Sequence, residues 1–268
     1  KENELLTFSY RFSSNPTLNR MTTEYSNLSG YAYLPPTLIN RRTRPDDDSY
    51  EHTGQIDYTT PWGKYQTFNA GAKFIARTNE TNTMQWDATV TAPESWTLNE
   101  NKSRHYRHHN NIYATYLEYT LRTGKLSATA GLRYEYDAQS IRNLDGKSAD
   151  FDKHFSDLLP SLRLSCQMKE SEILKLSFNS RISRPDIKML TPYVNHEDGI
   201  SANYGNPYLD TERGYNISLE YSKFAPKLTI NTGLNGMFTG NGLTNYSFLD
   251  ADNIVNQTYD NFMHRRIV

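Results

Sequence analysis

Cysteine is almost missing from this chain of 268 residues, since Cys166 is the single one. One thiol excludes an internal disulfide framework and any metal site built from several cysteines. The sequence also lacks a run of about 18 apolar residues, so no transmembrane helix is predicted. A chain of this kind can cross a bilayer only with strands.

Charge of one sign is not in excess either. The 29 Lys and Arg residues stand against 30 Asp and Glu residues, and the formal net charge is −1. Because no basic stripe is present, the long-range attraction to phosphate that nucleic-acid binding needs is missing, and nucleic acid is not an expected partner. The mean hydropathy of −0.77 decides nothing, because an outer-membrane barrel has a polar lumen and polar loops.

The sequence pattern at neither end predicts a processing or closing segment. Residues 1–10 have no basic region followed by an apolar region and a cleavage site. Residues 265–268 do not resemble the finished closing strand of a barrel. We therefore interpret the chain as a fragment of a longer protein.

The most informative pattern is an alternation of apolar and polar residues with period two. Within residues 126–137 the even-numbered residues are apolar, whereas the odd-numbered ones are small, polar or charged. Residues 113–122 alternate in the same way, and the Gly-containing link 123–125 makes the two segments a hairpin. Three more hairpins are predicted, formed by residues 56–62 with 68–76, 162–168 with 174–182, and 215–221 with 228–238.

The links inside these hairpins are short, whereas the connections between them, at 78–108, 140–154 and 186–213, are long and polar. This asymmetry is typical of an antiparallel up-and-down transmembrane β-barrel with periplasmic turns and extracellular loops. With further strands at residues 6–12 and around a turn at 250–253, we count about nine or ten strands, each with roughly the 9–11 residues that cross the hydrocarbon.

The 20 tyrosines suit a membrane interface, or the surface of a soluble carbohydrate-binding β-sandwich. One face of the predicted strands carries charged residues, which fits a water-filled lumen better than a sandwich core. These residues are Arg133, Glu135, Lys175, Arg181 and Glu220. Two aromatic girdles are predicted, a lower one of Trp62, Phe68, Tyr119 and Tyr221 and an upper one of Phe74, Tyr113, Tyr134, Tyr136 and Tyr215.

Residues 181–221 contain Arg-Ile-Ser-Arg-Pro at 181–185, Leu-Thr-Pro-Tyr at 190–193 and Tyr-Gly-Asn-Pro-Tyr-Leu-Asp-Thr-Glu at 204–212. This order resembles the strand, loop and strand signature of TonB-dependent outer-membrane receptors. Segments at 51–61, 70–74, 130–135 and 159–162 are similar to the Bacteroidetes branch of that family, so the resemblance covers nearly the whole chain. Thr191-Pro192 departs from the Asn-Pro of the family.

The resemblance implies a barrel of about 22 strands, a plug domain, and a TonB box that engages the TonB complex. Residues 1–268 would then be part of the barrel, with the plug, the TonB box and the closing strand outside this chain. The implied function is TonB-dependent uptake of a scarce nutrient such as a metal chelate, cobalamin, a glycan or a peptide. Outer-membrane lipid, the TonB complex and a surface lipoprotein that delivers substrate are the expected partners.

Two groups of candidate residues follow. Aromatic side chains of extracellular loops suit stacking on sugars and chelates, and the predicted ligand contacts are Trp86, Trp96, Tyr193 and Tyr204. The family motif supplies residues that we interpret as architectural, because Pro and Gly determine where pairing ends and how a loop folds back. They are Arg184, Pro185, Pro192, Gly205, Asn206, Pro207 and Glu212.

No metal site, cofactor or catalytic residue is assigned. His105, His108 and His109 lie among basic neighbours, and we interpret them as a solvated loop. Asp46 to Asp48 lack the spacing of a calcium loop and are attributed to turn chemistry. An outer-membrane barrel hydrolase remains a second alternative to transport, because serine and histidine on neighbouring strands can meet without a spacing signal.

Overall fold

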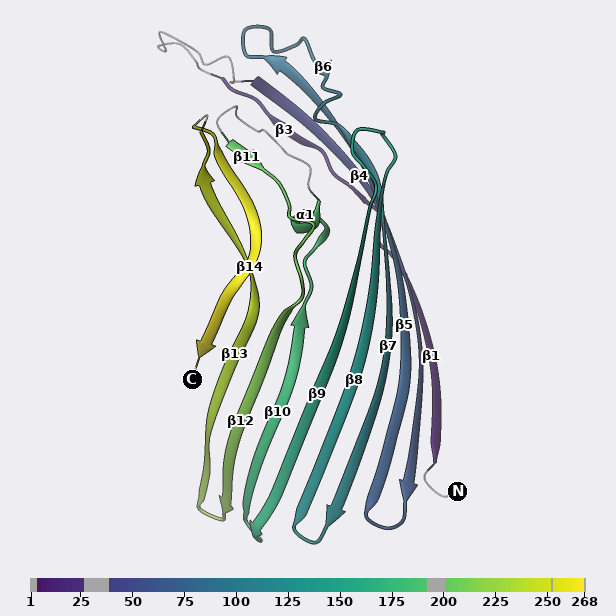
Figure 1. Cartoon of the computed structure of the whole chain (residues 1–268), viewed down its shortest axis with the longest axis vertical. Helices are drawn as coiled ribbons and strands as arrows, with labels where there is room; N and C mark the ends of the chain where they lie inside the picture. Colours follow the sequence, from purple (N-terminus) through teal and green to yellow (C-terminus); the bar gives the residue numbers. More distant parts are fainter. Residues whose placement is uncertain (1–3, 27–38, 192–200, 252, 268) are drawn as a thin grey trace.

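The chain forms one large, curved sheet (Figure 1). The computed structural model describes residues 4–26, 39–191, 201–251 and 253–267, with the backbone alone for 263–267. Within this part of the chain, fourteen strands follow the order β1-β4-β5-β7-β8-β9-β10-β12-β13-β14-β11, with β2 and β3 on β4 and β6 on β5. Each long strand pairs antiparallel with its neighbours, whereas β11 runs parallel to β14. The antiparallel fold is confirmed.

Ten strands are long enough to cross a bilayer, in agreement with the predicted count. They are β1 (Leu5–Ser14), β4 (Ile39–Trp62), β5 (Gln66–Thr89), β7 (Arg104–Thr123), β8 (Leu126–Asn143), β9 (Phe151–Lys169), β10 (Glu172–Ser183), β12 (Glu212–Ala225), β13 (Leu228–Leu249) and β14 (Val255–Ile267). The short pieces are β2 (Thr17–Leu18), β3 (Met21–Thr23), β6 (Thr97–Leu98), β11 (Ser201–Asn203) and the helix α1 (Ile187–Leu190). No helix of the described residues is long and apolar enough to cross a membrane.

The predicted hairpin turns lie together at the lower end of the sheet in Figure 1. Gly63 and Gly124 have positive φ values of 72° and 53°, a backbone conformation that a residue with a Cβ adopts only with strain. The tight turns at these glycines bring β4 against β5 and β7 against β8.

The alternation gives the sheet two different faces. On the outer face, Leu117, Leu132 and Leu158 are exposed by 54%, 48% and 59%, as expected of side chains that lipid covers. The inner face carries Arg133 and Glu135, which form an ion pair. The predicted orientation of β8 is therefore confirmed.

Aromatic rings form two rows across the outer face. Near the turns, Phe68 lies 5.1 Å from Trp62 and 4.9 Å from Tyr119, centroid to centroid. Higher up, Tyr113 lies 4.9 Å from Phe74 and 6.4 Å from Tyr136. These rows are the lower and upper girdles that the sequence predicts, and they mark the interfaces of the bilayer.

The predicted loops at 78–108 and 140–154 are wrong in extent. β5 continues to Thr89, β7 starts at Arg104, and β8 and β9 reach Asn143 and Phe151. Above the upper girdle both faces of a strand meet water, so the apolar alternation ends while the ladder of backbone hydrogen bonds continues. In the connection predicted at 186–213, the described residues up to Thr211 are irregular apart from the short α1 and β11, and β12 begins at Glu212.

The sheet is open. Within the described residues β1 pairs with β4 but not with β14. The edge of β14 that faces away from β13 pairs with β11, and only at residues 255–257. A ladder between first and last strand, which would make a small closed pore, is therefore not formed. One continuous sheet also excludes the two packed sheets of a soluble sandwich.

Two neighbours on opposite faces of β8 test the assignment of the faces. Leu132→Arg puts a cation on the lipid side, and we expect it to disfavour barrel assembly by about 2–4 kcal/mol. Arg133→Leu alters only the inner face, where Glu135 keeps its contact with Arg184. Heat-modifiable migration of the outer-membrane fraction measures assembly, and equal losses in both variants would contradict this orientation.

Candidate functional site

Three carboxylates gather on the inner face of β8 and β9. Glu135 and Asp137 alternate inward on β8, and Asp157 lies opposite Glu135 in the antiparallel register. Asp137 and Asp157 are almost fully buried, each with 1–2% exposure. Buried carboxylates are costly unless cations or hydrogen-bond donors compensate them.

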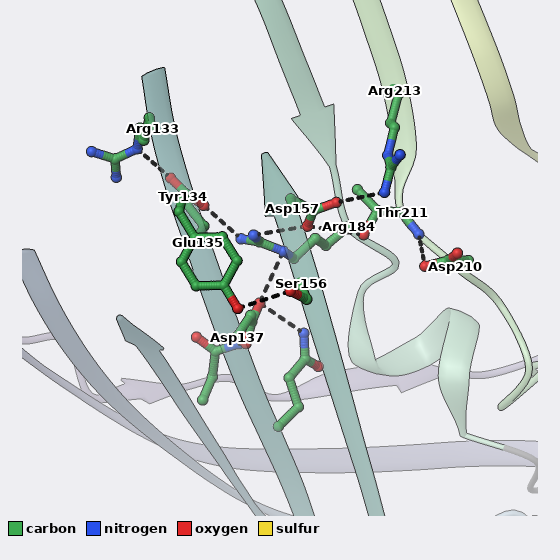
Figure 2. Close-up of polar contacts among 12 residues, drawn as sticks. Arg133, Tyr134, Glu135, Asp137, Ser156, Asp157, Arg184, Asp210, Thr211 and Arg213 are labelled. Atoms are coloured by element: carbon green, nitrogen blue, oxygen red, sulfur yellow. Dashed lines mark hydrogen bonds and ion pairs between the residues drawn. The ribbon is translucent and has the colours of Figure 1, made fainter. Parts of the chain in front are cut away.

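Arg184 of the Arg-Pro motif provides that compensation (Figure 2). Its Nη1 lies 3.0 Å from Glu135 Oε2 and its Nη2 lies 3.1 Å from Asp157 Oδ2. Its Nε lies 3.5 Å from Asp137 Oδ2, an ion pair without hydrogen-bond geometry. One planar guanidinium therefore reaches three carboxylates on two strands, an arrangement that the compact ammonium of lysine does not match.

Two further guanidinium groups complete the network. Arg133 Nε contacts Glu135 Oε1 at 2.6 Å, and Arg213 Nη2 contacts Asp157 Oδ1 at 3.5 Å. The Thr211 hydroxyl donates to Asp157 Oδ2 at 3.3 Å. Asp137, Asp157 and Arg213 are not among the residues predicted from the sequence. Asp137 and Asp157 share the inward parity of Glu135 on β8 and β9, whereas no local pattern distinguishes Arg213.

The network ties the connection between β10 and β12 to the inner face. Next to Arg184, Pro185 is fully buried, and Leu190 of α1 packs with Leu209 and Phe155 in a small apolar cluster. Asp186 caps α1 by accepting a hydrogen bond from Met189 N at 2.9 Å. The described parts of this connection therefore fold inward instead of projecting away from the sheet.

The Gly-Asn-Pro element makes close contacts with neighbouring segments, and its architectural role stays a prediction. A Cβ at Gly205 would lie 2.5 Å from the carbonyl oxygen of Met189, so only glycine fits there. Asn206 donates from Nδ2 to the carbonyl oxygen of Tyr259 at 3.0 Å, and the carbonyl oxygen of Pro207 accepts from Lys153 Nζ at 3.2 Å.

Glu212 is the last motif residue, and its Oε2 accepts from Leu243 N at 2.9 Å. This contact lies where the register of β13 and β14 shifts, beside Asn241 with its φ of 59°. Glu212 therefore satisfies a backbone donor that the bulge releases. Pro192 of the motif lies outside the described residues.

A polar cavity of about 380 Å³ lies between α1 and the wall of β7 and β8. His108 Nε2, Asn110 Oδ1 and Gln139 Oε1 are buried there without a hydrogen-bond partner among the described residues. Burial also lowers the pKa of the His108 imidazole, which lies above the upper girdle. Unsatisfied polar atoms in a cavity of this size are suited to holding water or a small hydrophilic solute.

A second cavity, of about 340 Å³, opens beside it and is called the mouth cavity below. It lies between the inward-folded connection, the upper parts of β7 and β8, and β14. Its lining contains tyrosines and cationic side chains, among them Arg104, Tyr106, Lys188, Tyr204 and Tyr259. Aromatic rings beside cations can bind a ligand that combines flat surface with negative charge.

The predicted ligand residues separate into two places. Tyr204 lines the mouth cavity. Trp86 and Trp96 line another cavity, near β3, and Trp86 lies on β5 instead of in a loop because β5 is longer than expected. Tyr193 lies outside the described residues.

The histidines and aspartates considered for metal binding also lie on strands. His105, His108 and His109 belong to β7, which corrects the predicted loop. His105 Nε2 donates to Glu80 Oε1 at 2.8 Å, and this hydrogen bond, followed by one from Arg107, lowers the pKa of the Glu80 carboxyl. His108 faces inward, so the three imidazoles do not converge. Among the described residues, no group of three acidic, histidine or cysteine side chains is placed to hold a metal.

Asp46 to Asp48 lie inside β4, where Asp46 and Asp47 pair with β2. The turn predicted for them is therefore wrong, since the ladder with β5 continues through these residues.

A family model described as the outer membrane protein beta-barrel family matches residues 1–268. The chain belongs to this family. Its place is therefore the bacterial outer membrane, and the predicted resemblance is confirmed at the level of the family. The restriction to the Bacteroidetes branch stays a prediction. No curated protein matches the sequence.

Several solved structures share the fold of this chain. The copper transporter OprC has a TM-score of 0.65 at 12% identity, over 98% of this chain and 39% of that one. The siderophore receptor PiuA from Acinetobacter baumannii has a TM-score of 0.60 at 13% identity, over 99% and 41%. The unliganded ferric citrate transporter FecA has a TM-score of 0.57 at 15% identity, over 88% and 32%. The chain thus spans about a third to two fifths of these proteins.

The Arg184 network should hold the inward-folded connection against this family's barrel wall. Arg184→Met leaves three carboxylates without their shared cation, and we expect a loss of about 3–5 kcal/mol in the free energy of unfolding. Amide hydrogen exchange at Leu190 and Gly205 should accelerate in this variant. Urea unfolding of the folded protein in detergent measures the first effect, and mass spectrometry the second.

Arg142→Gln is the matched control. Arg142 pairs with Asp150 and Asp152 at the surface, where an ion pair contributes little. If both variants behave alike, the connection is not held by Arg184.

Proposed function

We propose that the protein is an outer-membrane receptor and transporter for TonB-dependent uptake of a scarce nutrient. The observation that carries this proposal is the two-faced wall: a lipid-suited outer face, bounded by two aromatic rows, encloses an inner face lined with charge and polar cavities. A wall of this kind separates lipid from an aqueous path. The transporters and the receptor named above have the same fold, which supports the transport proposal.

The mouth cavity is the proposed site of first contact with the substrate. It lies at the end of the sheet opposite the short turns, which in outer-membrane barrels is the extracellular end. Its tyrosines and the cations Arg104 and Lys188 suit a metal chelate, cobalamin, a glycan or a peptide. Among the predicted ligand residues that the structure describes, Tyr204 is the one that lines this cavity.

The remaining parts of the receptor are proposed to lie outside this chain. Among the described residues, both edges of the sheet have unpaired backbone groups, which cannot face hydrocarbon, and this supports further strands that continue the wall. A barrel of about 22 strands would accommodate ten here. A plug domain, a TonB box that reaches the TonB complex, and a surface lipoprotein that delivers substrate complete the proposal.

Uptake assays test transport directly. Cells that depend on this receptor should lose uptake of the limiting nutrient when the receptor or TonB is deleted, or when an uncoupler collapses the proton gradient. Tyr204→Ala should weaken substrate binding by roughly two- to tenfold, the range for one aromatic contact. Tyr208→Ala is the control from the same connection, because its side chain is 88% exposed and does not line the cavity. Uptake that persists without TonB would overturn the energised mechanism.

Detergent dependence tests the membrane assignment of the intact protein. The exposed apolar outer face should make it aggregate in buffer alone and become monodisperse in detergent micelles, as size-exclusion chromatography with light scattering measures. A protein that stays monodisperse without detergent and is missing from the outer-membrane fraction would contradict the transport proposal.

A further inference from the structure

The upper ends of β3, β4 and β5 form a separate surface. In Figure 1 these strands continue past the rest of the sheet and lean over its upper end. Their register places Thr22, Arg42 and Trp86 side by side across three strands. Even-numbered residues of β4 and β5 lie on the outer face, so this row belongs to the face opposite the mouth cavity.

This surface lies well beyond the hydrocarbon. Phe74 of the upper girdle is paired with Gly54, and Arg42 precedes Gly54 in the same strand. At about 3.3 Å per residue, the distance along the strand is on the order of 40 Å. The two tryptophans here are therefore too far from the bilayer to belong to an aromatic girdle.

A cavity of about 560 Å³ occupies this surface. Its lining combines cations with indole rings and contains no acidic residue: Arg20, Thr22, Arg42, Arg44, Trp86 and Trp96. The volume is sufficient for a ligand of two or three sugar rings. We call it the arginine-tryptophan cavity.

The three guanidinium groups are poorly neutralised. Arg42 has one acidic neighbour, Glu24, at 4.0 Å, and both side chains are about half exposed. Arg20 and Arg44 form no ion pair with the described residues. Like charges this close repel one another, and a bound anion would relieve the repulsion through charge-assisted hydrogen bonds.

The indole rings add a flat, partly buried wall. Trp96 lies under the Arg42 guanidinium, 4.1 Å from ring centroid to Cζ, so both groups are held in position before a ligand arrives. Trp86 lies opposite Arg42 on the neighbouring strand. Indole faces stack on the C–H faces of sugar rings, while guanidinium groups form forked contacts with carboxylate, sulfate or phosphate.

We propose that the arginine-tryptophan cavity is a binding site for an anionic saccharide, separate from the mouth cavity. The saccharide can be a free acidic glycan or the phosphorylated sugar of lipopolysaccharide, which share this chemistry. The extracellular position of the site rests on the proposed function, whereas the binding itself does not. A site of this kind would concentrate a free acidic glycan near the mouth cavity, or bind the receptor to neighbouring lipopolysaccharide.

Tryptophan fluorescence of the intact protein in detergent micelles tests the site. Two of the three tryptophans of this chain line the cavity, and the third, Trp62, lies at the lower girdle. A sulfated heparin disaccharide and trigalacturonic acid should quench the emission and bind at least tenfold more tightly than neutral maltotriose. Their affinity should fall as salt rises, because exposed charges are screened.

Matched variants locate the effect. Arg42→Gln combined with Arg44→Gln should weaken binding of the acidic saccharides at least tenfold, and Trp96→Ala should remove most of the quenching. Arg107→Gln should change neither, since Arg107 lies on the same face but outside the cavity and pairs with Glu80 at 2.6 Å. Equal affinity for neutral and acidic saccharides, or equal losses in the Arg42/Arg44 and Arg107 variants, would overturn the proposal.

Nanodiscs distinguish the two sources of the saccharide. Quenching in nanodiscs that contain lipopolysaccharide, but not in phosphatidylcholine nanodiscs, would assign the site to the phosphorylated sugar of the membrane, and quenching by soluble saccharides alone would assign it to a free glycan. No response in any of these arms would overturn the site. Nutrient uptake is measured independently. If the unchanged protein takes up its nutrient but binds none of these saccharides, this inference is refuted and the proposed transport is not, whereas saccharide binding without TonB-dependent uptake refutes the proposed transport and not this site.

Discussion

Backbone N–H and C=O groups cannot remain unpaired in hydrocarbon, and the rest of this structure depends on that constraint. Antiparallel ladders satisfy it strand by strand, and each ladder forces alternate side chains to opposite faces. One face must then suit lipid and the other water. The leucines and aromatic rows of the outer face, and the arginines and carboxylates of the inner face, are two consequences of the same hydrogen bonds.

The inner face brings a second constraint, because buried charges need partners. Glu135, Asp137 and Asp157 come together simply because their strands are neighbours in register. Their compensation comes from Arg184, which belongs to the connection after β10. The connection is thus drawn to the wall, where Leu190 and Leu209 pack with Phe155. Its residues Ile187, Tyr204 and Gly205 line the mouth cavity. Charge pairing on the wall therefore shapes the candidate entrance.

The extension of the strands above the bilayer has a different effect. Where both faces of a strand meet water, neither face needs apolar side chains for insertion into lipid. Side chains on both faces can then bind ligands. The mouth cavity, on the inner side, is rich in tyrosine and carries two cations. The arginine-tryptophan cavity, on the outer side, concentrates three arginines, for which the described residues supply one acidic partner, Glu24 at 4.0 Å from Arg42. The same wall can in this way present two chemically distinct surfaces to the outside of the cell.

The period-two pattern was sufficient to predict the antiparallel hairpins, the direction in which Leu132 and Arg133 point, and both aromatic rows, because these depend on local alternation alone. It underestimated β4, β5 and β7, since a ladder with two wet faces leaves no apolar signal. The Gly-Asn-Pro element indicated a folded-back connection, but not the carboxylates that Arg184 reaches on β8 and β9. Likewise the sequence alone identified Trp86 and Trp96 as separate loop aromatics. Only the register of β3, β4 and β5 places them with Arg20, Arg42 and Arg44, because which distant residues become neighbours is decided by strand pairing and not by any local pattern.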